Sequence, residues 1–402
     1  MLSKWLRISF FNLMLVAFLG VILRYKILYS LPFLDQKHLL HAHSHFAFSG
    51  WVSQLLMVLL VASLSRQKGV SLFAKYNRLL YANLITAVGM LIFFVLQGYA
   101  LFSILFSTLS IVVSWLFAFA YWKDLNRVPV KTVSHYWIKA ALVFNALSAM
   151  GAFSLAYMMA NKTVHQNWYL LSVYFFLHFQ YNGWFLFACM GLLMQKIQVY
   201  FPDQQLLIKI FRLFLLACVP AYFLSALWLN LPLWLYVLVV AAALAQIAGW
   251  ICLVKRLFAV KSSLSPTLTD ITKWLLSFSG VAFSIKLILQ LGSTIPSLSQ
   301  LAFGFRPIVI GYLHLILLGV ITLFLLGYVF AEKMIPLKRT VKLGVLVFTA
   351  GVILNEFLLM IEGVAAMAYT LVPWINELLL FTAFFLFSGM LLLNFGTRRQ
   401  KE

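Results

Sequence analysis

The chain has 402 residues, of which 64% are hydrophobic and only 10% are charged, and its mean hydropathy is +0.99. Soluble proteins carry about 25% charged residues, so this composition excludes a soluble globular protein and indicates a polytopic membrane protein. A net charge of +21 would suggest nucleic-acid binding in a soluble chain, but here the Lys and Arg residues lie in short loops between apolar segments. We therefore expect the lipid bilayer, and no nucleic acid, as a partner.

Apolar segments long enough to cross the roughly 30 Å hydrocarbon layer recur along the whole sequence. We predict twelve transmembrane helices and no strands, in a single polytopic transmembrane domain over residues 1–402. The predicted helices are centred near Val16, Trp51, Gly89, Val112, Leu147, Asn182, Cys218, Ala243, Val281, Gly319, Gly351 and Phe385.

Basic residues gather after every second predicted helix. They lie within 66–78, 123–131, 196–212, 255–261, 333–342 and 398–401, the last group being Arg398, Arg399 and Lys401. The loops after the third, seventh and eleventh helices contain no Lys or Arg. Because basic loops remain in the cytoplasm, both termini are predicted to be cytoplasmic.

Several kinds of site are excluded by the sequence. Cys189, Cys218 and Cys252 all lie within apolar segments, so a disulfide framework is not expected, and no Cys-x-x-Cys pair is present. The chain also lacks a phosphate-binding Gly-x-x-x-x-Gly-Lys-[Ser/Thr] loop, a His-Glu-x-x-His motif and a haem-attaching Cys-x-x-Cys-His motif.

Histidine is scarce, yet three of the eight histidines fall within His41-Ala42-His43-Ser44-His45, at the start of the second predicted helix. The segment His45-Phe-Ala-Phe-Ser-Gly-Trp matches His178-Phe-Gln-Tyr-Asn-Gly-Trp in the sixth helix at His, Phe, Gly and Trp. His314 lies in the tenth helix and is followed by a later glycine. Helices two, six and ten all run from outside to inside, so these histidines are expected at one depth, roughly 5–15 Å below the outer surface.

A polar side chain in the bilayer costs free energy unless it is paired or bound, so these histidines are candidate functional residues. His41 and His45 are four residues apart and share one helix face, whereas His43 points about 200° away from His41. Helix-packing polar contacts remain the alternative interpretation, above all for the turn around His178 with Gln180, Tyr181 and Asn182. Lys286 and Glu356 are further buried ionisable residues that suit a proton path, a buried ion pair or a transporter's coupling site.

The twelve predicted helices, the cytoplasmic termini and the histidines of helices two, six and ten resemble the catalytic subunit, subunit I, of the haem-copper oxidase superfamily. That superfamily includes the cytochrome c oxidases and the nitric oxide reductases. The resemblance extends over the membrane domain in topology, but only over short histidine motifs in sequence. It implies an all-α bundle in which a four-helix unit is repeated three times around an axis.

The resemblance also implies roles for individual residues. One of His41, His43 and His45 would be the helix-two ligand of a low-spin, b-type haem, and His314 would be its second ligand. Tyr312 stands where the family has the histidine that binds a high-spin haem. His178 matches the helix-six ligand of the second metal, with Tyr181 near it. The seventh helix, Ile210 to Asn230, contains no histidine, so two ligands of the second metal are missing.

The sequence therefore favours bis-histidine haem binding over oxygen or nitric oxide reduction, and whether the protein is an enzyme stays open. We expect a divergent member of the superfamily that acts in electron transfer, sensing or assembly of a respiratory complex, with a redox partner or other respiratory subunits, in the bacterial inner membrane. One alternative is a transporter or channel without haem, lined by Lys286, Glu356 and the Gln180 turn. Another is a lone copper or zinc ion bound by His178 and the helix-two histidines.

Overall fold

A computed structural model describes residues 1–163, 165–201 and 203–397. The predicted basic cluster Arg398, Arg399 and Lys401 lies outside these residues. In the described part the chain is helical throughout, with 86% of residues in helices and no strand. The fold is therefore all-α, and the protein is an integral membrane protein.

Within the described residues, ten helical segments are long and apolar enough to cross a membrane, and the number is eleven if one bent pair of helices counts as one span. The bent pair, α9 (Gln204–Cys218) and η4 (Pro220–Ala226), turns by 42°. The bend lies at Pro220, which has no N–H to continue an α-helix. The ten spans are Leu2–Leu28, Gln36–Lys68, Phe73–Gln97, Leu101–Asn126, Val133–Ala160, Leu233–Ala259, Asp270–Gly292, Arg306–Ala331, Arg339–Met367 and Ile375–Gly396.

Every centre predicted from the sequence lies in a helix, but the count of twelve membrane spans stays a prediction. The predicted sixth span is helical without a break through α7 (Gln166–His178), η2 (Phe179–Phe185) and α8 (Leu186–Ile197). It is not among the ten apolar spans. The reason is its polar middle, where His178, Gln180 and Asn182 lower the mean hydropathy.

The chain divides into two compact units, which are described separately. Unit 1 comprises Met1–Tyr121 and Leu325–Glu402, and unit 2 comprises Trp122–Phe324. In order, unit 1 contains α1 (Leu2–Leu28), α2 (Gln36–His45), η1 (Phe46–Ser53), α3 (Gln54–Lys68), α4 (Phe73–Gln97), most of α5 (Leu101–Asn126), most of α15 (Leu323–Ala331), α16 (Arg339–Met367) and α17 (Ile375–Gly396). Unit 2 contains α6 (Val133–Ala160), α7, η2, α8, η3 (Gln198–Tyr200), α9, η4, α10 (Leu233–Ala259), α11 (Lys261–Leu264), η5 (Ser265–Thr267), α12 (Asp270–Gly292), α13 (Pro296–Gly304), α14 (Arg306–His314) and η6 (Leu315–Thr322).

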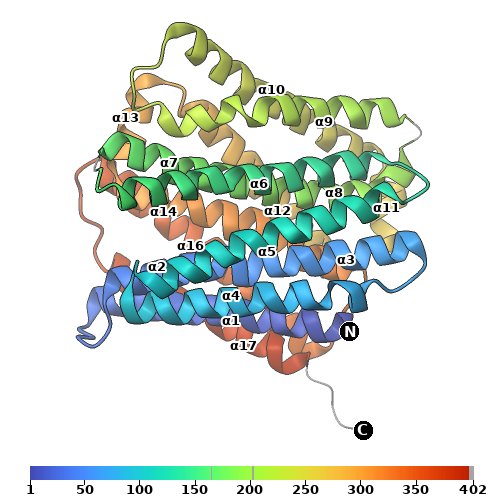
Figure 1. Ribbon diagram of the computed structural model, residues 1–402, viewed down its shortest axis with the longest axis horizontal. Helices are drawn as coiled ribbons and strands as arrows, with labels where there is room; N and C mark the ends of the chain where they lie inside the picture. Colours follow the sequence, from blue (N-terminus) through green and yellow to red (C-terminus); the bar gives the residue numbers. More distant parts are fainter. Residues whose placement is uncertain (164, 202, 398–402) are drawn as a thin grey trace. The chain divides into compact units, whose positions relative to one another are not determined.

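In unit 1, the span formed by α2, η1 and α3 is packed against both α1 and α4 (Figure 1). It is the most buried of the ten spans, with 89% of its apolar window inside the protein. A helix so enclosed can hold polar side chains away from lipid, because neighbouring helices supply partners. This span carries His41, His43 and His45.

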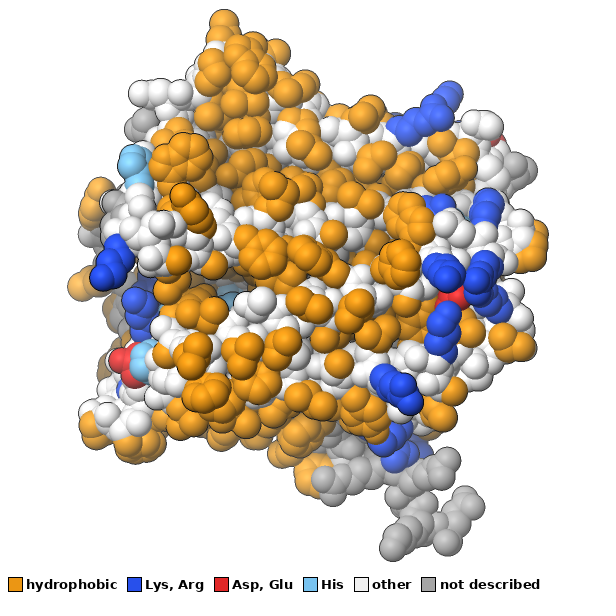
Figure 2. Space-filling view, in the orientation of Figure 1, with side chains coloured by type: hydrophobic (Ala, Val, Ile, Leu, Met, Phe, Trp, Pro, Cys, Tyr) orange, Lys and Arg blue, Asp and Glu red, His pale blue; other side chains and the backbone are white. Residues whose placement is uncertain are grey.

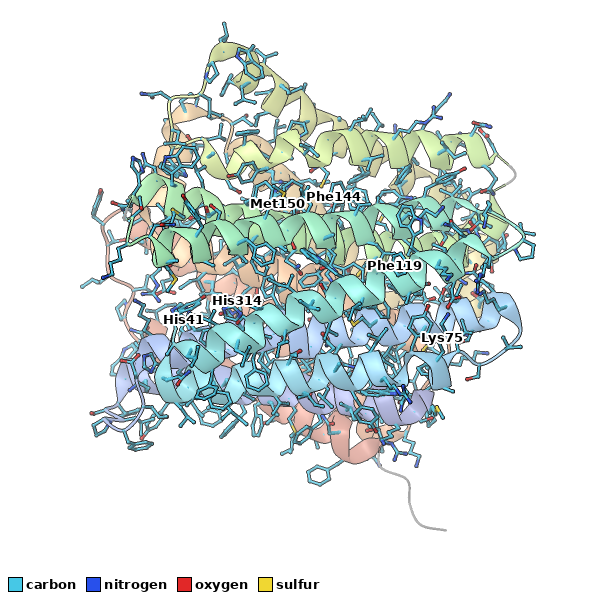
Figure 3. All side chains as sticks on the ribbon, in the orientation of Figure 1. His41, Lys75, Phe119, Phe144, Met150 and His314 are labelled. Carbon is cyan, nitrogen blue, oxygen red and sulfur yellow. The ribbon has the colours of Figure 1, made fainter. Side chains whose placement is uncertain are left out.

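Basic residues at helix ends of unit 1 contact polar groups of other segments in the same unit. The Lys4 ammonium at the start of α1 donates to the Tyr81 hydroxyl on α4, and Arg66 at the end of α3 pairs with Glu332. Figure 2 shows Lys and Arg side chains at the helix ends and hydrophobic side chains along the helix sides. Within this unit, Lys75 and His41 lie at opposite ends (Figure 3). The side of the membrane that each end faces stays a prediction.

In unit 2, α6 packs against α7, η2 and α8, α9 packs against α10, and α12 packs against α10 and η6. Close contacts occur at small residues, as is usual between membrane helices. A Cβ atom on Gly183 of η2 would lie 2.6 Å from the Cβ of Phe144 on α6 (Figure 3). The aromatic side chain therefore fills the space that the glycine leaves.

The α16–α17 contact in unit 1 yields a first prediction. A Cβ atom on Gly389 would lie 2.5 Å from the backbone nitrogen of Phe348, which cannot move aside. Gly389→Ala is expected to lower the free energy of unfolding by about 1–3 kcal/mol through overpacking, measured by thermal unfolding in detergent. Gly280→Ala on α12 is the matched control, because its nearest contact would be an ordinary 3.8 Å. Equal stability of the two variants would contradict the expectation.

Candidate functional site

Three histidines share one local structure. His45, His178 and His314 each end an α-helix, and in each case a π-helix follows at once: η1, η2 and η6. A glycine follows five residues after each histidine, as Gly50, Gly183 and Gly319. Short π-helical segments are rare and often mark functional sites. The sequence indicated that the first two histidine segments match, and the π-helices extend the match to the third.

Donors from neighbouring helices support the π-helical segments. A π-helix misaligns the regular ladder of backbone hydrogen bonds, and side chains can then bond to its carbonyl groups. In η1 the Asn12 amide donates to the Gly50 carbonyl at 2.6 Å, and in η6 the Ser279 hydroxyl donates to the Val320 carbonyl at 2.8 Å. In η2 the Cys218 thiol lies 3.9 Å from the Asn182 carbonyl, a weak contact of the same kind.

Helix α2 begins at a well-defined cap. The Asp35 carboxylate accepts a hydrogen bond of 2.8 Å from the backbone N–H of His38, and this bond lowers the pKa of the carboxyl group. A carboxylate at this position satisfies an N–H that has no partner within the helix. The cap fixes where the helix starts and therefore which face each histidine occupies.

His41 and His45 lie on one face of α2, and both contact Phe94 of α4 and Tyr99 of the loop between α4 and α5. The His45 ring stacks on Phe94 at 4.3 Å between centroids, and its Nε2 lies 3.0 Å from the Tyr99 hydroxyl. The Nε2 atom of His41 is buried and has no hydrogen-bond partner. His43 lies on another face, where its Cε1 approaches Gly20 of α1.

His178 is fully buried, with 1% of its surface exposed, and both of its ring nitrogens are hydrogen-bonded. Its Nε2 lies 2.8 Å from the Cys218 carbonyl oxygen, which can only accept, so Nε2 carries the proton. Nδ1 then accepts from the Asn182 amide at 3.1 Å. Cys218 was not expected here, because its partner atom belongs to the backbone and leaves no trace in the sequence. A histidine bonded in this way has no lone pair left for a metal ion.

His314 is oriented differently. Its Nδ1 lies 2.9 Å from the Ile310 carbonyl oxygen one turn earlier, so Nδ1 carries the proton and Nε2 carries the lone pair. Tyr312, two residues before it, lies near enough to Tyr181 for the two to interact electrostatically. Within unit 2 the segments η2 and η6, which follow His178 and His314, are in contact.

The predicted site residues thus fall into two groups. His41, His43 and His45 belong to unit 1, and His178, Tyr181, Tyr312 and His314 belong to unit 2. Among the described residues, no three His, Cys, Asp or Glu side chains gather closely enough to hold a metal ion. The aromatic neighbours of His41 and His45, Phe94 and Tyr99, were missed, because nothing in their local sequence marks them.

No protein-family model matches the chain, and no curated protein matches it.

The π-helical segments yield a second prediction. Ser279→Ala removes the hydroxyl of α12 that donates to the Val320 carbonyl of η6, and is expected to cost about 0.5–1.5 kcal/mol of stability. Ser114→Ala is the control, because the Ser114 hydroxyl bonds only to a carbonyl of its own helix. Denaturant titration of both variants in mixed micelles measures the difference. If Ser114→Ala lowers the free energy of unfolding as much as Ser279→Ala does, the hydrogen bond to η6 contributes no more than a bond within one helix, and the expectation is wrong.

Proposed function

We propose that the protein binds haem in the membrane and works in electron transfer, sensing or assembly of a respiratory complex, as a divergent relative of haem-copper oxidase subunit I. The observation that carries the proposal is the common histidine structure. Three helices, each four places apart in the predicted order, change from α to π directly after a histidine. The bacterial inner membrane and a respiratory redox partner are parts of the same proposal.

His314 has the ring chemistry of a haem ligand. A ligating histidine almost always donates its second ring N–H to a carbonyl or carboxylate, which fixes the coordinating nitrogen. The bond from Nδ1 of His314 to the Ile310 carbonyl does this, and leaves Nε2 as the basic nitrogen. Tyr312 is the second candidate ligand of this helix, because a tyrosinate can also bind haem iron.

In α2 the favoured ligands are His41 and His45. Nε2 of His41 is a buried ring nitrogen without a hydrogen-bond partner, and a buried polar atom of this kind costs free energy unless something binds it. His45 would have to exchange its contact with the Tyr99 hydroxyl for the iron. When bound, haem would supply the redox chemistry, while these side chains would hold and orient it.

The residues present do not fit a second metal at His178. Both ring nitrogens are already hydrogen-bonded, and the predicted seventh helix offers no further histidine. Copper or another metal is therefore the weaker part of the cofactor proposal, and catalysis of oxygen or nitric oxide reduction is not proposed. A glycine beside a ligating histidine could make room for the haem macrocycle, but at η1 the ring of Phe46 fills the position beside Gly50.

The proposal predicts a red protein. The full-length chain, purified from haem-replete cells, is expected to show bis-histidine absorption and low-spin electron paramagnetic resonance signals, and His314→Ala should lose them. His165→Ala, at an exposed site before α7, is the matched control. Colourless wild-type protein would overturn the proposal. Metal analysis of the same sample separates it from a lone copper or zinc ion and gives the number of haems.

Single substitutions of the α2 histidines yield a further prediction. His43→Ala should keep the haem spectrum, whereas His41→Ala or His45→Ala should lose it, because only these two share the Tyr99 face. Absorption spectra of the three purified variants at equal protein concentration test this. Loss of haem in His43→Ala alone would assign the ligand to the opposite face.

A further inference from the structure

Lys286 on α12 is a buried lysine without a hydrogen-bond partner. Its side chain is 1% exposed, and its ammonium nitrogen makes no hydrogen bond. The ring of Phe283, one turn earlier, lies 5.4 Å from Nζ to its centroid. An ionised amine buried in low dielectric costs many kcal/mol unless a counter-charge or ligand compensates it. The position therefore needs a physical explanation.

No carboxylate of unit 2 serves as a counter-charge to Lys286. This unit contains three acidic residues, all engaged elsewhere. Asp124 lies 3.9 Å from Arg127, Asp203 caps the start of α9, and Asp270 pairs with Lys273 at 3.1 Å.

The ionisable groups that interact electrostatically with Lys286 are His178 and Cys218. The other two elements packed against α12 add none, because η6 and the buried middle of α10 contain no acidic or basic residue. His178 already carries its proton on Nε2, in the bond to the Cys218 carbonyl. Lys286 is thus the basic group of this cluster without a bonded partner.

Polar groups continue from Lys286 toward one end of α12. Gln290 lies one turn later on the same face, is 5% exposed, and has a buried side-chain oxygen without a partner. Thr294, a further turn on, lies just beyond the Gly292 end of the helix. In the opposite direction the same face continues with Phe283 and Ala282, both buried and apolar. The polar stripe therefore runs from Lys286 toward the Gly292 end of α12, and Phe283 bounds it on the other side.

A second helix adds an acceptor at the same level. Helix α10 runs antiparallel to α12, since the Tyr236 hydroxyl donates to the Thr294 carbonyl and the Trp250 indole donates to the Ser284 hydroxyl. Gln246, between those two contacts, comes level with Lys286. It is 4% exposed, and its side-chain oxygen also has no partner. One unsatisfied acceptor thus lies level with the unsatisfied donor Lys286, and a second lies one turn nearer Gly292.

We propose that Lys286 is a buried proton-binding site, which exchanges its proton with water at the Gly292 end of α12 by way of Gln290. The step is the simple equilibrium between an ammonium group and an amine plus a proton, and it needs no other reactant. A proton requires no cavity, whereas an anion would, so the contacts favour the proton. The site does not depend on haem, so the result of its test is independent of the test of the proposed function.

Nitrogen-15 NMR of the full-length protein in lipid, labelled at the lysine side-chain nitrogens, tests the proposal. One resonance is expected to move between the ammonium and the amine position as pH is changed, and Lys286→Met should lack it. If that variant does not fold, Phe283→Leu identifies the same resonance, because it removes the ring beside Nζ. The resonance of exposed Lys255 serves as the internal reference.

The exchange path is tested with Gln290→Leu, which should slow proton exchange at Lys286 while the fold is kept. Ile288→Leu is the matched control, since Ile288 points outward with 66% of its surface exposed. An ammonium resonance that persists at every pH and moves when chloride or nitrate is added would identify an anion site and overturn the proposal. A resonance that neither titrates nor exchanges with solvent would show a purely structural lysine and overturn it as well.

Discussion

Inside a membrane, every backbone polar group needs a partner from the protein, and this constraint shapes the regions around the histidines. A π-helical segment disturbs the helix's own hydrogen-bond ladder, so it survives in an apolar span only where another helix supplies a donor. Asn12 and Ser279 supply such donors to η1 and η6, and both are almost completely buried. The positions of α1 and α12 are tied in this way to the segments that carry His45 and His314.

The same constraint decides the chemistry of each histidine. A ring nitrogen that is bonded to a carbonyl must carry the proton, and the other nitrogen is then the basic one. The basic nitrogen of His178 accepts a hydrogen bond from the Asn182 amide. The protonated nitrogen of His314 donates to the Ile310 carbonyl, one turn earlier in the same helix. Two histidines in equivalent turns therefore differ in which ring nitrogen carries the proton: Nε2 in His178 and Nδ1 in His314.

The sequence predicted the fold class and the helix positions well, because long apolar runs are sufficient to define helices in a membrane. It also predicted that His41 and His45 share a face, since that follows from helix geometry alone. It did not predict the π-helices, whose backbone carbonyl groups accept hydrogen bonds from distant segments: those of η1 from Asn12 and Asn83, and that of η6 from Ser279. The carbonyl partner of His178 was equally hidden, because any residue type can present a carbonyl.

The residue four positions after each histidine explains why one motif has three outcomes. After His178 it is Asn182, whose amide reaches back to the imidazole. After His45 it is Ser49, whose hydroxyl donates to the backbone carbonyl of His45 and leaves the ring to Tyr99. After His314 it is Leu318, which has no polar group, so the ring bonds to its own helix. The side chain one turn after each histidine thus differs in its polarity, and the hydrogen bonds of the three imidazole rings differ with it.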